Sequence, residues 1–302
     1  KNEINNSVSI GIALYPDGSN SAESIQKNAD IAMYRAKDKG KNTFQFYSVE
    51  INDAYQRQAI IERQLHHAIR NKELYLVYQP QISLETGKIY GLEALIRWKN
   101  NKLGEVSPME FIPIAEDIGL ITSIGEWVLT ESCKQFKFWE TQYKSELDEN
   151  PLVLSINVSV LQLIQEYMVE HVRSTIEVLQ INPESLILEI TETALMLNID
   201  HSVKALTELH DIGVGIAIDD FGTGYSSLSY LKQLPFTTLK IDQSFVQDVT
   251  KDQNDASIVK AIIQLGSVMD LDILAEGVET KAQLNFLKKV GCHYAQGYYF
   301  DK

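Results

Sequence analysis

The sequence has few cysteines and no long hydrophobic run. Only Cys133 and Cys292 occur among 302 residues, which gives no disulfide framework and is typical of a protein from a reducing cytoplasm. The longest apolar runs, such as Pro151–Ile156 and Ile258–Leu265, are far shorter than the roughly 20 residues that cross a bilayer. No membrane contact is therefore expected from this chain, which we place in the cytoplasm or in the cytoplasmic portion of a membrane-anchored parent.

Positive charge is also scarce. There are 27 Lys and Arg residues against 41 Asp and Glu, for a formal net charge of −14. A broad basic face is thus excluded, and with it a duplex DNA or RNA binder. The hydrophobic content of 44% and the aromatic content of 9% are enough for a large core, which excludes wholesale disorder. The chain opens on Lys1 rather than Met, so we expect a fragment of a longer protein.

The first 48 residues predict one strand, one helix and a second strand. Apolar and polar residues alternate through Val8–Leu14, apolar positions recur at helical spacing in Ala22–Lys39, and Thr43–Tyr47 has the pattern of a short strand. Three such elements cannot bury a core by themselves. Residues 1–48 are therefore expected to be a piece of a domain.

Residues 49–71 predict a helical linker, and residues 72–302 predict a barrel. After the linker, apolar β-branched runs alternate with amphipathic stretches, which implies a mostly parallel sheet. Eight runs within about 230 residues favour a (β/α)₈ barrel. The first two runs are joined by Glu85–Lys88, too short for a parallel crossover, so one antiparallel pair is expected. The runs are Leu74–Tyr78, Ile89–Ile96, Leu152–Val158, Leu186–Thr191, Val214–Ile218, Thr238–Ile241, Ile273–Ala275 and Tyr294–Phe300.

A polar residue lies at or beside the end of most of these runs. In a parallel barrel such side chains converge on one mouth. Packed carboxylates raise one another's pKa, so either several are protonated or cations lie among them. Oxygen donors without histidine or thiolate suit Mg²⁺ or Mn²⁺. The residues are Glu93, Asn157, Glu189, Asp219, Asp220, Lys240, Asp242, Glu276 and Gln296.

Their arrangement suggests chemistry on a phosphodiester. One carboxylate of the adjacent pair Asp219 and Asp220 could bridge two ions, Lys240 could position a water, and Glu276 could accept a proton or ligate the second ion. Two simpler alternatives stay open. Any single acid could be a solvated or capping residue, and Asp219–Gly224 could be only a glycine-rich turn. The same glycines could equally allow a mobile active-site loop that approaches the metals.

Together these residues resemble the EAL family of cyclic di-GMP phosphodiesterases over about residues 60–302. The resemblance lies in motifs that appear in family order. They are Tyr78–Pro80, Glu93–Arg97 with Glu-Ala-Leu at its start, Ser107–Pro113, Asn157–Ser159, Glu189–Glu192, Asp219–Gly224 followed by Tyr225–Ser227, Leu239–Asp242, Ala275–Glu279 and Gln296–Tyr298.

The resemblance implies a fold, an activity and a site. It implies a TIM-barrel-like (β/α)₈ domain with one antiparallel strand that hydrolyses cyclic di-GMP to linear pGpG with two Mg²⁺ or Mn²⁺ ions. Lys240 would orient the water, with Glu276 as the base. One ion would be held by Glu93, Asn157, Glu189 and Asp219, and the second by Asp219, Asp220 and Glu276.

The resemblance also assigns residues to the substrate and to a loop. Glu192 would anchor the loop that begins at Asp220, with Glu279 as a second anchor. A homodimer is expected, since the family commonly pairs through the barrel. The chain ends at Lys302, short of the proline-containing tail of the family. The dinucleotide would be contacted by Gln79, Leu95, Arg97 and Gln296.

The first block resembles the C-terminal third of a GGDEF (diguanylate cyclase) domain. The similarity is in Val8–Ala13, Tyr15-Pro16, Asn28–Lys37 and Gly40–Asn42. The nucleotide-binding signature of that family would precede Lys1, so this chain is not expected to make cyclic di-GMP, and upstream sensory and GGDEF regions are expected in the parent. Two alternatives to the phosphodiesterase stay open: a catalytically silent cyclic di-GMP receptor, and a sugar- or phosphate-processing barrel enzyme.

Overall fold

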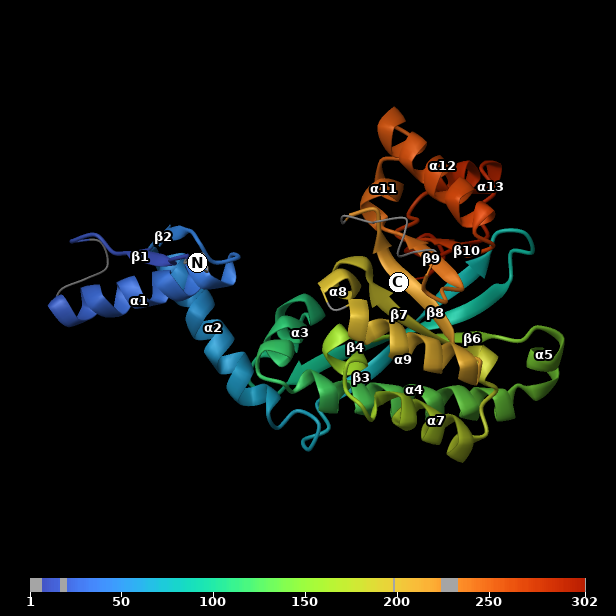
Figure 1. The fold of residues 1–302 in the computed structure, drawn as a ribbon, viewed down its shortest axis with the longest axis horizontal. Helices are drawn as coiled ribbons and strands as arrows, with labels where there is room; N and C mark the ends of the chain where they lie inside the picture. The colour runs from blue at the N-terminus through green and yellow to red at the C-terminus, as the bar shows by residue number, and fades with distance from the viewer. Residues whose placement is uncertain (1–6, 17–20, 198, 224–232, 302) are drawn as a thin grey trace, which may run out of the picture.

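The N-terminal unit is a small α/β fragment beside a barrel (Figure 1). The computed structural model describes residues 7–16, 21–197, 199–223 and 233–301. Strands β1 (Ile10–Ile12) and β2 (Phe44–Phe46) pair in parallel, and helix α1 (Ala22–Asp38) packs on them. The expected strand–helix–strand order is confirmed. Asp17 and Gly18, which follow Tyr15-Pro16, lie outside the described residues.

Close packing of α1 on β1 depends on Gly11. A Cβ at this position would lie 1.9 Å from the carbonyl oxygen of Ala29. On the two-stranded sheet, Ile10, Phe44 and Phe46 remain about half exposed. The fragment therefore buries few apolar side chains, as its length predicts.

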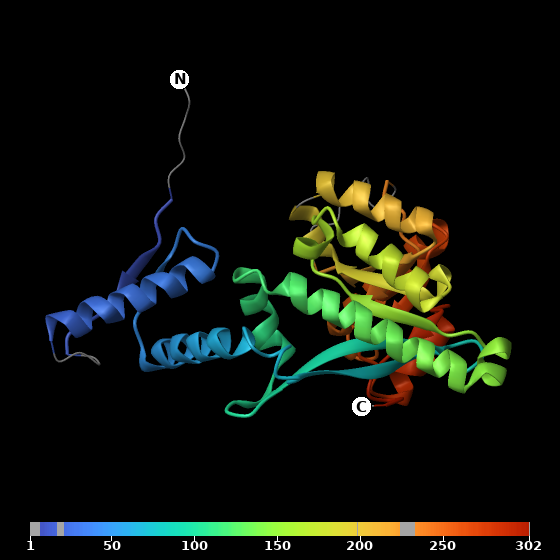
Figure 2. The same cartoon turned by 90° about the horizontal axis from the view of Figure 1, so that it is seen from below.

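Helix α2 (Val49–Leu65) joins the fragment to the barrel, as Figure 2 shows. Its N-cap, Ser48, accepts a hydrogen bond from the backbone N–H of Ile51 at 3.4 Å. Near its other end, Ile61 and Leu65 are buried in the same hydrophobic core as the barrel strands. The helix is thus more than a spacer, because its last turns are part of the barrel's packing.

The barrel is closed by eight strands, and a ninth extends one edge. Around the ring the order is β3-β11-β10-β9-β8-β7-β6-β4, with β3 paired back to β4. The predicted (β/α)₈-like fold is confirmed. The strands are β3 (Leu74–Ser83), β4 (Ile89–Asn100), β6 (Val153–Asn157), β7 (Leu186–Thr191), β8 (Gly215–Phe221), β9 (Thr238–Ile241), β10 (Asp272–Ala275) and β11 (Tyr294–Ala295), with β5 (Gly104–Val106) at the edge.

Strand β3 runs against both of its neighbours, β4 and β11. The sequence predicted one antiparallel pair, and barrel closure adds the second, because a reversed strand in a ring has two neighbours. The last strand is shorter than the predicted Tyr294–Phe300. Gly297 has φ +151°, and a Cβ there would lie 2.3 Å from the backbone nitrogen of Val278, so the chain leaves the sheet to pack on this loop.

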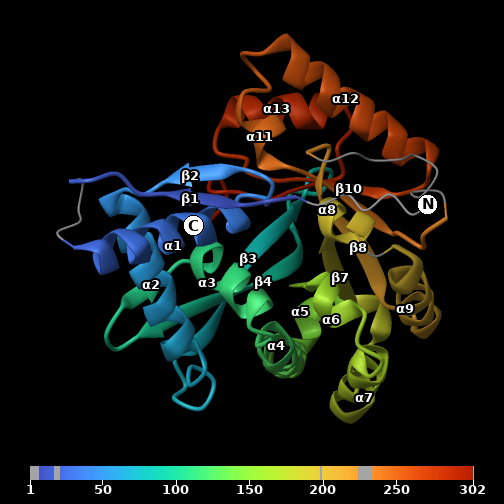
Figure 3. The ribbon, with the colours of Figure 1, turned by 60° about the vertical axis from the view of Figure 1, so that its left-hand side comes forward.

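The helices lie outside the ring of strands, as Figure 3 shows for α4, α7, α9 and α12. The amphipathic stretch between β6 and β7 contains two helices, α6 and α7, and α3 precedes α4 between β5 and β6. The helices are α3 (Pro108–Asp117), α4 (Ile121–Gln142), α5 (Lys144–Glu149), α6 (Val160–Leu163), α7 (Met168–Leu179), α8 (Glu192–Leu197), α9 (Ile199–Ile212), α11 (Gln243–Gln247), α12 (Gln253–Val268), α13 (Lys281–Lys289) and the 3₁₀ turn η1 (Pro183–Ser185).

Candidate active site

A buried lysine lies among four carboxyl groups at the C-terminal ends of the parallel strands. The side chain of Lys240, on β9, is fully buried. Its Nζ lies 2.5 Å from Glu189, 2.8 Å from Glu276, 3.2 Å from Asp219 and 3.7 Å from Glu93. The parallel strands bring these residues together although they are up to 183 positions apart in the sequence, since Glu93 and Glu276 are the outermost. The predicted convergence at one mouth is thus present.

Two amide side chains orient Glu93. Asn157 Nδ2 donates to Glu93 Oε1 at 2.7 Å, and Gln296 Nε2 donates to Glu93 Oε2 at 2.5 Å. The same Gln296 nitrogen donates to Gln79 Oε1 at 2.7 Å. Gln296 Oε1 is buried and has no hydrogen-bond partner among the described residues. The amide oxygen is therefore available to a donor from a ligand.

A bulge in β8 presents two consecutive acids to the mouth. Regular alternation would direct Asp219 and Asp220 to opposite faces. The pairing with β9 shifts between Ile218 and Phe221, and Asp220 has φ +54°. As a result, carboxylate oxygens of Asp219, Asp220 and Glu276 lie within 4.8 Å of one another. Three oxygen donors at this spacing could hold a divalent cation.

The electrostatics of the cluster call for more positive charge. Burial, together with Asp219 and Glu93, raises the pKa of Glu276 to about 8 despite Lys240. Burial and the neighbouring Asp219 raise the pKa of Asp220 to about 6. The pKa of the buried Glu189 is also raised well above its usual value. One lysine cannot offset this many acids, so protons or cations must accompany them.

Glu93 and Lys240 shift toward their charged forms. Burial alone would raise the pKa of Glu93, but the charge of Lys240 and the hydrogen bonds from Gln296 and Asn157 outweigh it, and the pKa falls. Burial alone would lower the pKa of Lys240, yet the surrounding carboxylates, Glu189 first, raise it. The centre of the site is thus a fixed positive charge beside a fixed negative charge.

The loop after β8 is held by Glu192 at the start of α8. Glu192 is buried, and its Oε2 accepts a hydrogen bond from the backbone N–H of Gly222 at 3.0 Å. Gly222 has φ +98°, and a Cβ there would lie 3.0 Å from the ring of Phe245, so glycine fits both the backbone and the space. Of the expected loop motif, Gly224 and Tyr225–Ser227 lie outside the described residues.

Three of the four expected substrate-binding residues lie along β3 and β4, and the fourth, Gln296, directly follows β11. Gln79 pairs with Glu93 across the two strands, so both share one face. Leu95 and Arg97 follow Glu93 at two-residue steps and share that face as well. The Arg97 guanidinium is half-buried and donates to the carbonyl oxygen of Ile96 at 2.9 Å. These residues thus form a row that starts at the carboxylate cluster.

Two further strand-end acids have local roles. Asp242 caps α11, accepting from the backbone N–H of Ser244 at 3.0 Å, and it adds to the upward shift in the pKa of Asp220. Glu279 is exposed, and its backbone N–H donates to Gln283 Oε1 at 2.9 Å. Glu279 therefore lies at the surface near the cap of α13, and its part in anchoring the loop stays a prediction.

The comparisons with known proteins identify the family. Residues 62–302 match the family model described as "EAL domain", which is most of the chain. The chain belongs to the EAL domain family. Residues 1–43 match the model described as "Diguanylate cyclase, GGDEF domain", so the EAL domain is preceded by a short GGDEF fragment. Both resemblances seen in the sequence are confirmed.

Relatives of this EAL domain include proteins from Pseudomonas aeruginosa. The chain is 43% identical over 298 residues to the "Bifunctional diguanylate cyclase/cyclic di-GMP phosphodiesterase MucR", covering 99% of this chain and 43% of that protein. It is 37% identical over 294 residues to the "Cyclic di-GMP phosphodiesterase NbdA", covering 97% of this chain and 37% of that protein. The chain thus spans less than half the length of either relative.

Solved structures with the EAL fold include two cyclic di-GMP complexes. "PaMucR Phosphodiesterase, c-di-GMP complex" superimposes with a TM-score of 0.75 at 42% identity, covering 80% of this chain and 96% of that one. The FimX EAL domain from Pseudomonas aeruginosa, bound to c-di-GMP, gives a TM-score of 0.72 at 26% identity, covering 80% of this chain and 95% of that one.

In this EAL chain, no helix within the described residues is long and apolar enough to span a membrane.

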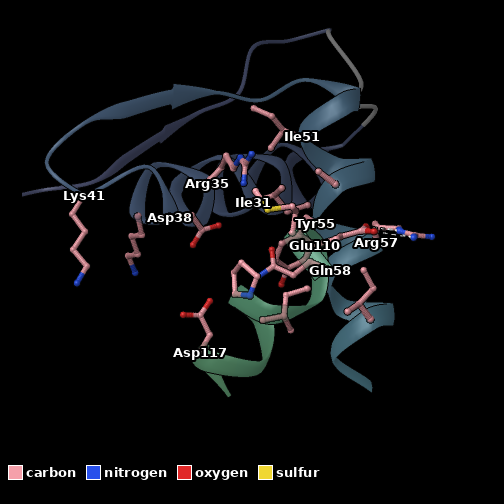
Figure 4. A pocket seen from close by; sticks show the side chains of 16 residues that line it. Ile31, Arg35, Asp38, Lys41, Ile51, Tyr55, Arg57, Gln58, Glu110 and Asp117 are labelled. Carbon is pink, nitrogen blue, oxygen red and sulfur yellow. Dashed lines mark hydrogen bonds and ion pairs between the residues drawn. The ribbon is translucent and has the colours of Figure 1, made fainter. Parts of the chain in front are cut away.

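A cleft of about 760 Å³ lies apart from the carboxylate site. It is formed between α1, α2 and α3 and contains the side chains of Arg35, Arg57, Glu110 and Asp117 (Figure 4). None of the strand-end acids lines it. The cleft therefore adds nothing to the EAL site, but it shows where the linker helix meets the barrel.

Two residues near Asn157 were given no role from the sequence: Ser159, which only appeared in the motif Asn157–Ser159, and Glu116, which was in no motif. Ser159 caps α6, and its Oγ donates to Glu116 Oε1 on α3 at 2.6 Å. The spacing of Ser159 and Gln162, a serine followed three residues later by glutamine, is a capping-box signal that could have revealed the start of α6. The contact with Glu116 joins residues 43 positions apart, and no local pattern indicates it.

Proposed function

We propose that this chain hydrolyses cyclic di-GMP to linear pGpG in a divalent-metal-dependent reaction. The observation that carries the proposal is the buried Lys240 among Glu93, Glu189, Asp219 and Glu276 at the barrel mouth. The similarity to MucR and NbdA supports the choice of substrate, because both relatives are named as cyclic di-GMP phosphodiesterases.

The donor set fits Mg²⁺ or Mn²⁺. All candidate ligands are carboxylate or amide oxygens, which these ions prefer, and the oxygens of Asp219, Asp220 and Glu276 lie close enough to share a cation. When bound, such ions polarise a phosphate and lower the pKa of a water. We propose that two ions are held by Glu93, Asn157, Glu189, Asp219, Asp220 and Glu276.

Glu276 and Lys240 are suited to the proton and charge changes of hydrolysis. Once deprotonated, the Glu276 carboxylate is placed beside Lys240 to take a proton from an attacking water, which suits a general base. Lys240 donates 2.8 Å away to the same carboxylate and keeps its charge, so it can orient a water beside Glu276 and offset developing negative charge.

The β3–β4 row is proposed to bind the dinucleotide. Arg97 supplies a guanidinium for a phosphate, and Leu95 supplies an apolar surface between Arg97 and Glu93. Gln296 presents an unpartnered buried oxygen to a donor of the substrate, with Gln79 holding its amide nitrogen.

Turnover of cyclic di-GMP by the purified chain tests the proposal. With Mn²⁺ or Mg²⁺ we expect one product, pGpG, by chromatography, and no product after chelation. Glu93→Ala should abolish turnover, whereas Glu85→Ala, in the exposed turn between β3 and β4, should not change it. A parent chain that binds cyclic di-GMP without converting it would contradict hydrolysis.

The second candidate function is a catalytically silent cyclic di-GMP receptor. It is kept as a candidate because the FimX EAL domain, which has this fold, was solved with c-di-GMP bound, and such binding does not by itself require turnover. Binding without turnover in the experiment above would be the result expected from it. Absence of any affinity for cyclic di-GMP would contradict both functions and favour another barrel enzyme.

The remaining assignments concern the context of the domain. We propose that residues 1–48, 49–71 and 72–302 are the GGDEF fragment, linker and EAL domain of a longer cytoplasmic signalling protein, or of the cytoplasmic part of a membrane-anchored one. We also propose a homodimer. A monomeric mass by light scattering at high micromolar concentration would contradict the dimer.

A further inference from the structure

The segment that follows Asn157 is held on three sides. On one side, the backbone N–H of Val158 donates to the carbonyl oxygen of Glu189 on β7 at 2.9 Å. On a second side, Ser159 Oγ donates to Glu116 Oε1 on α3 at 2.6 Å. On the third, the backbone N–H of Ser159 donates to Gln162 Oε1 at 3.1 Å, which closes the capping box of α6.

Packing against α4 keeps this arrangement tight. Gln162 is buried, and its amide lies against Gly125 of α4. A Cβ at Gly125 would lie 1.7 Å from Gln162 Nε2. The helix thus lacks a side chain at the place where Gln162 needs room, so the segment after Asn157 has little freedom to shift toward α4.

The hydrogen bond from Ser159 to Glu116 links the segment after Asn157 to a more distant part of the chain. The other hydrogen bonds of the segment are within α6 or with the neighbouring strand. A short O–H···O bond to a carboxylate is among the stronger hydrogen bonds in proteins. Glu116 lies in the last turn of α3, so it fixes Ser159 relative to a separate helix.

We infer that Glu116 is a positioning residue for Asn157. It holds Ser159, two residues along the chain, and thereby directs the Asn157 amide toward Glu93, to which Nδ2 donates at 2.7 Å. This inference rests on the proposed function, in which Asn157 and Glu93 ligate a divalent ion. Groups that orient metal ligands from behind typically change metal affinity strongly when they are removed.

Manganese binding by the purified chain tests the inference. In titration calorimetry, Glu116→Ala should weaken Mn²⁺ binding about tenfold. Glu116→Gln keeps an oxygen acceptor for Ser159 and should bind Mn²⁺ nearly as tightly as the parent. The matched control is Asp117→Ala, the exposed neighbour on the same helix, which should leave the affinity unchanged.

A background without the ligand separates positioning from general stability. In the Asn157→Ala variant, adding Glu116→Ala should cause no further loss of Mn²⁺ affinity, because the residue that Glu116 positions has been removed. An equal loss in both backgrounds would overturn the inference and indicate a purely structural role. Unchanged Mn²⁺ affinity in Glu116→Ala would overturn it as well.

Hydrogen exchange without metal distinguishes this inference from the proposed function. Peptides covering residues 157–163 should exchange faster in metal-free Glu116→Ala than in the parent or Asp117→Ala, and no change there would overturn the positioning role. If instead the folded parent bound no Mn²⁺ but these peptides still exchanged faster in Glu116→Ala, the metal-dependent function would be contradicted. The role of Glu116 in positioning a metal ligand would be contradicted with it.

Discussion

Lys240 stabilises an arrangement of acids that repel one another. It forms ion pairs with carboxyl groups on three strands, β4, β7 and β8, and with Glu276, which directly follows β10. Burying a charge is costly unless it is paired, and three of the partners, Glu93, Glu189 and Asp219, are themselves buried acids, while Glu276 is partly buried. Each member of the cluster therefore depends on the others, and a change at one residue alters the protonation of the rest.

Replacing Lys240 should destabilise the metal-free chain and stop turnover. Lys240→Met keeps the length of the side chain but leaves its acids without a cation, which should cost about 3 kcal/mol in urea unfolding near pH 8. Added Mn²⁺ should recover much of the stability, though not the turnover. The control Lys251→Met removes an exposed i,i+3 pair with Asp248 and should cost below about 1 kcal/mol. A Lys240→Met chain as stable as its parent would contradict this.

Metal binding at neutral pH should release protons. The pKa of Glu276 is raised from 4.5 to about 8, so at pH 7 this carboxyl is mostly protonated without metal and must lose its proton to become a ligand. The Mn²⁺ binding enthalpy at pH 7 should therefore depend on the ionisation enthalpy of the buffer. The dependence should fade toward pH 9, above the raised pKa, and weaken in Glu276→Gln. Enthalpies equal in all buffers at pH 7 would rule the raised pKa out.

At the scale of elements, the barrel and the linker helix meet through α3. Arg57 on α2 donates from Nε to Glu110 Oε1 at 2.6 Å and from Nη2 to Oε2 at 3.1 Å. Figure 4 shows this pair at the edge of the cleft between the helices. Farther along α2, Ile61 and Leu65 are in the barrel core. The two halves of α2 are therefore held by different forces, one polar and partly exposed, the other apolar and buried.

Removing the ion pair should loosen only the first half of α2. Arg57 and Glu110 are 40% and 35% exposed, so Arg57→Ala should change global stability by only about 0.2–1 kcal/mol. Hydrogen exchange should rise in residues 49–58 and stay unchanged in residues 61–65. Arg63→Ala, an exposed arginine on the same helix, is the control and should affect neither half. Unchanged exchange in residues 49–58 would show that the ion pair does not hold this half.

Local sequence patterns predicted the barrel strands well where the apolar residues of the pattern are also the buried ones. All eight barrel strands follow apolar runs, and the acids at their ends indicated the site because parallel strands share one mouth. The pattern failed where contacts distant in sequence decide the structure. The positive φ of Asp220 depends on the bulge in β8, the early end of β11 depends on Gly297 against Val278, and the Glu116–Ser159 bond joins two helices. No window of neighbouring residues contains these causes.

On the scale of the whole molecule, the chain has two unequal parts. The barrel core extends from Ile61 to Ala295, and none of its buried members in the described chain comes from the N-terminal unit. That unit buries Ile31, Ala32 and Ala36 while leaving Ile10 and Phe44 half exposed. The barrel thus carries the site and most of the apolar burial, and the fragment carries exposed apolar surface.

Deleting residues 1–47 should leave a folded and active barrel. The shortened chain keeps Ser48, the N-cap of α2, together with Ile61 and Leu65, so the packing of the linker helix on the barrel is retained. We expect one cooperative thermal transition near that of the parent and the same kcat/KM for cyclic di-GMP, because every candidate site residue lies beyond position 78.

Removing the half-exposed side chains of Ile10, Phe44 and Phe46 should also reduce self-association in size-exclusion chromatography at high concentration. A shortened chain that unfolds or loses turnover would show that α1 stabilises the barrel through α2.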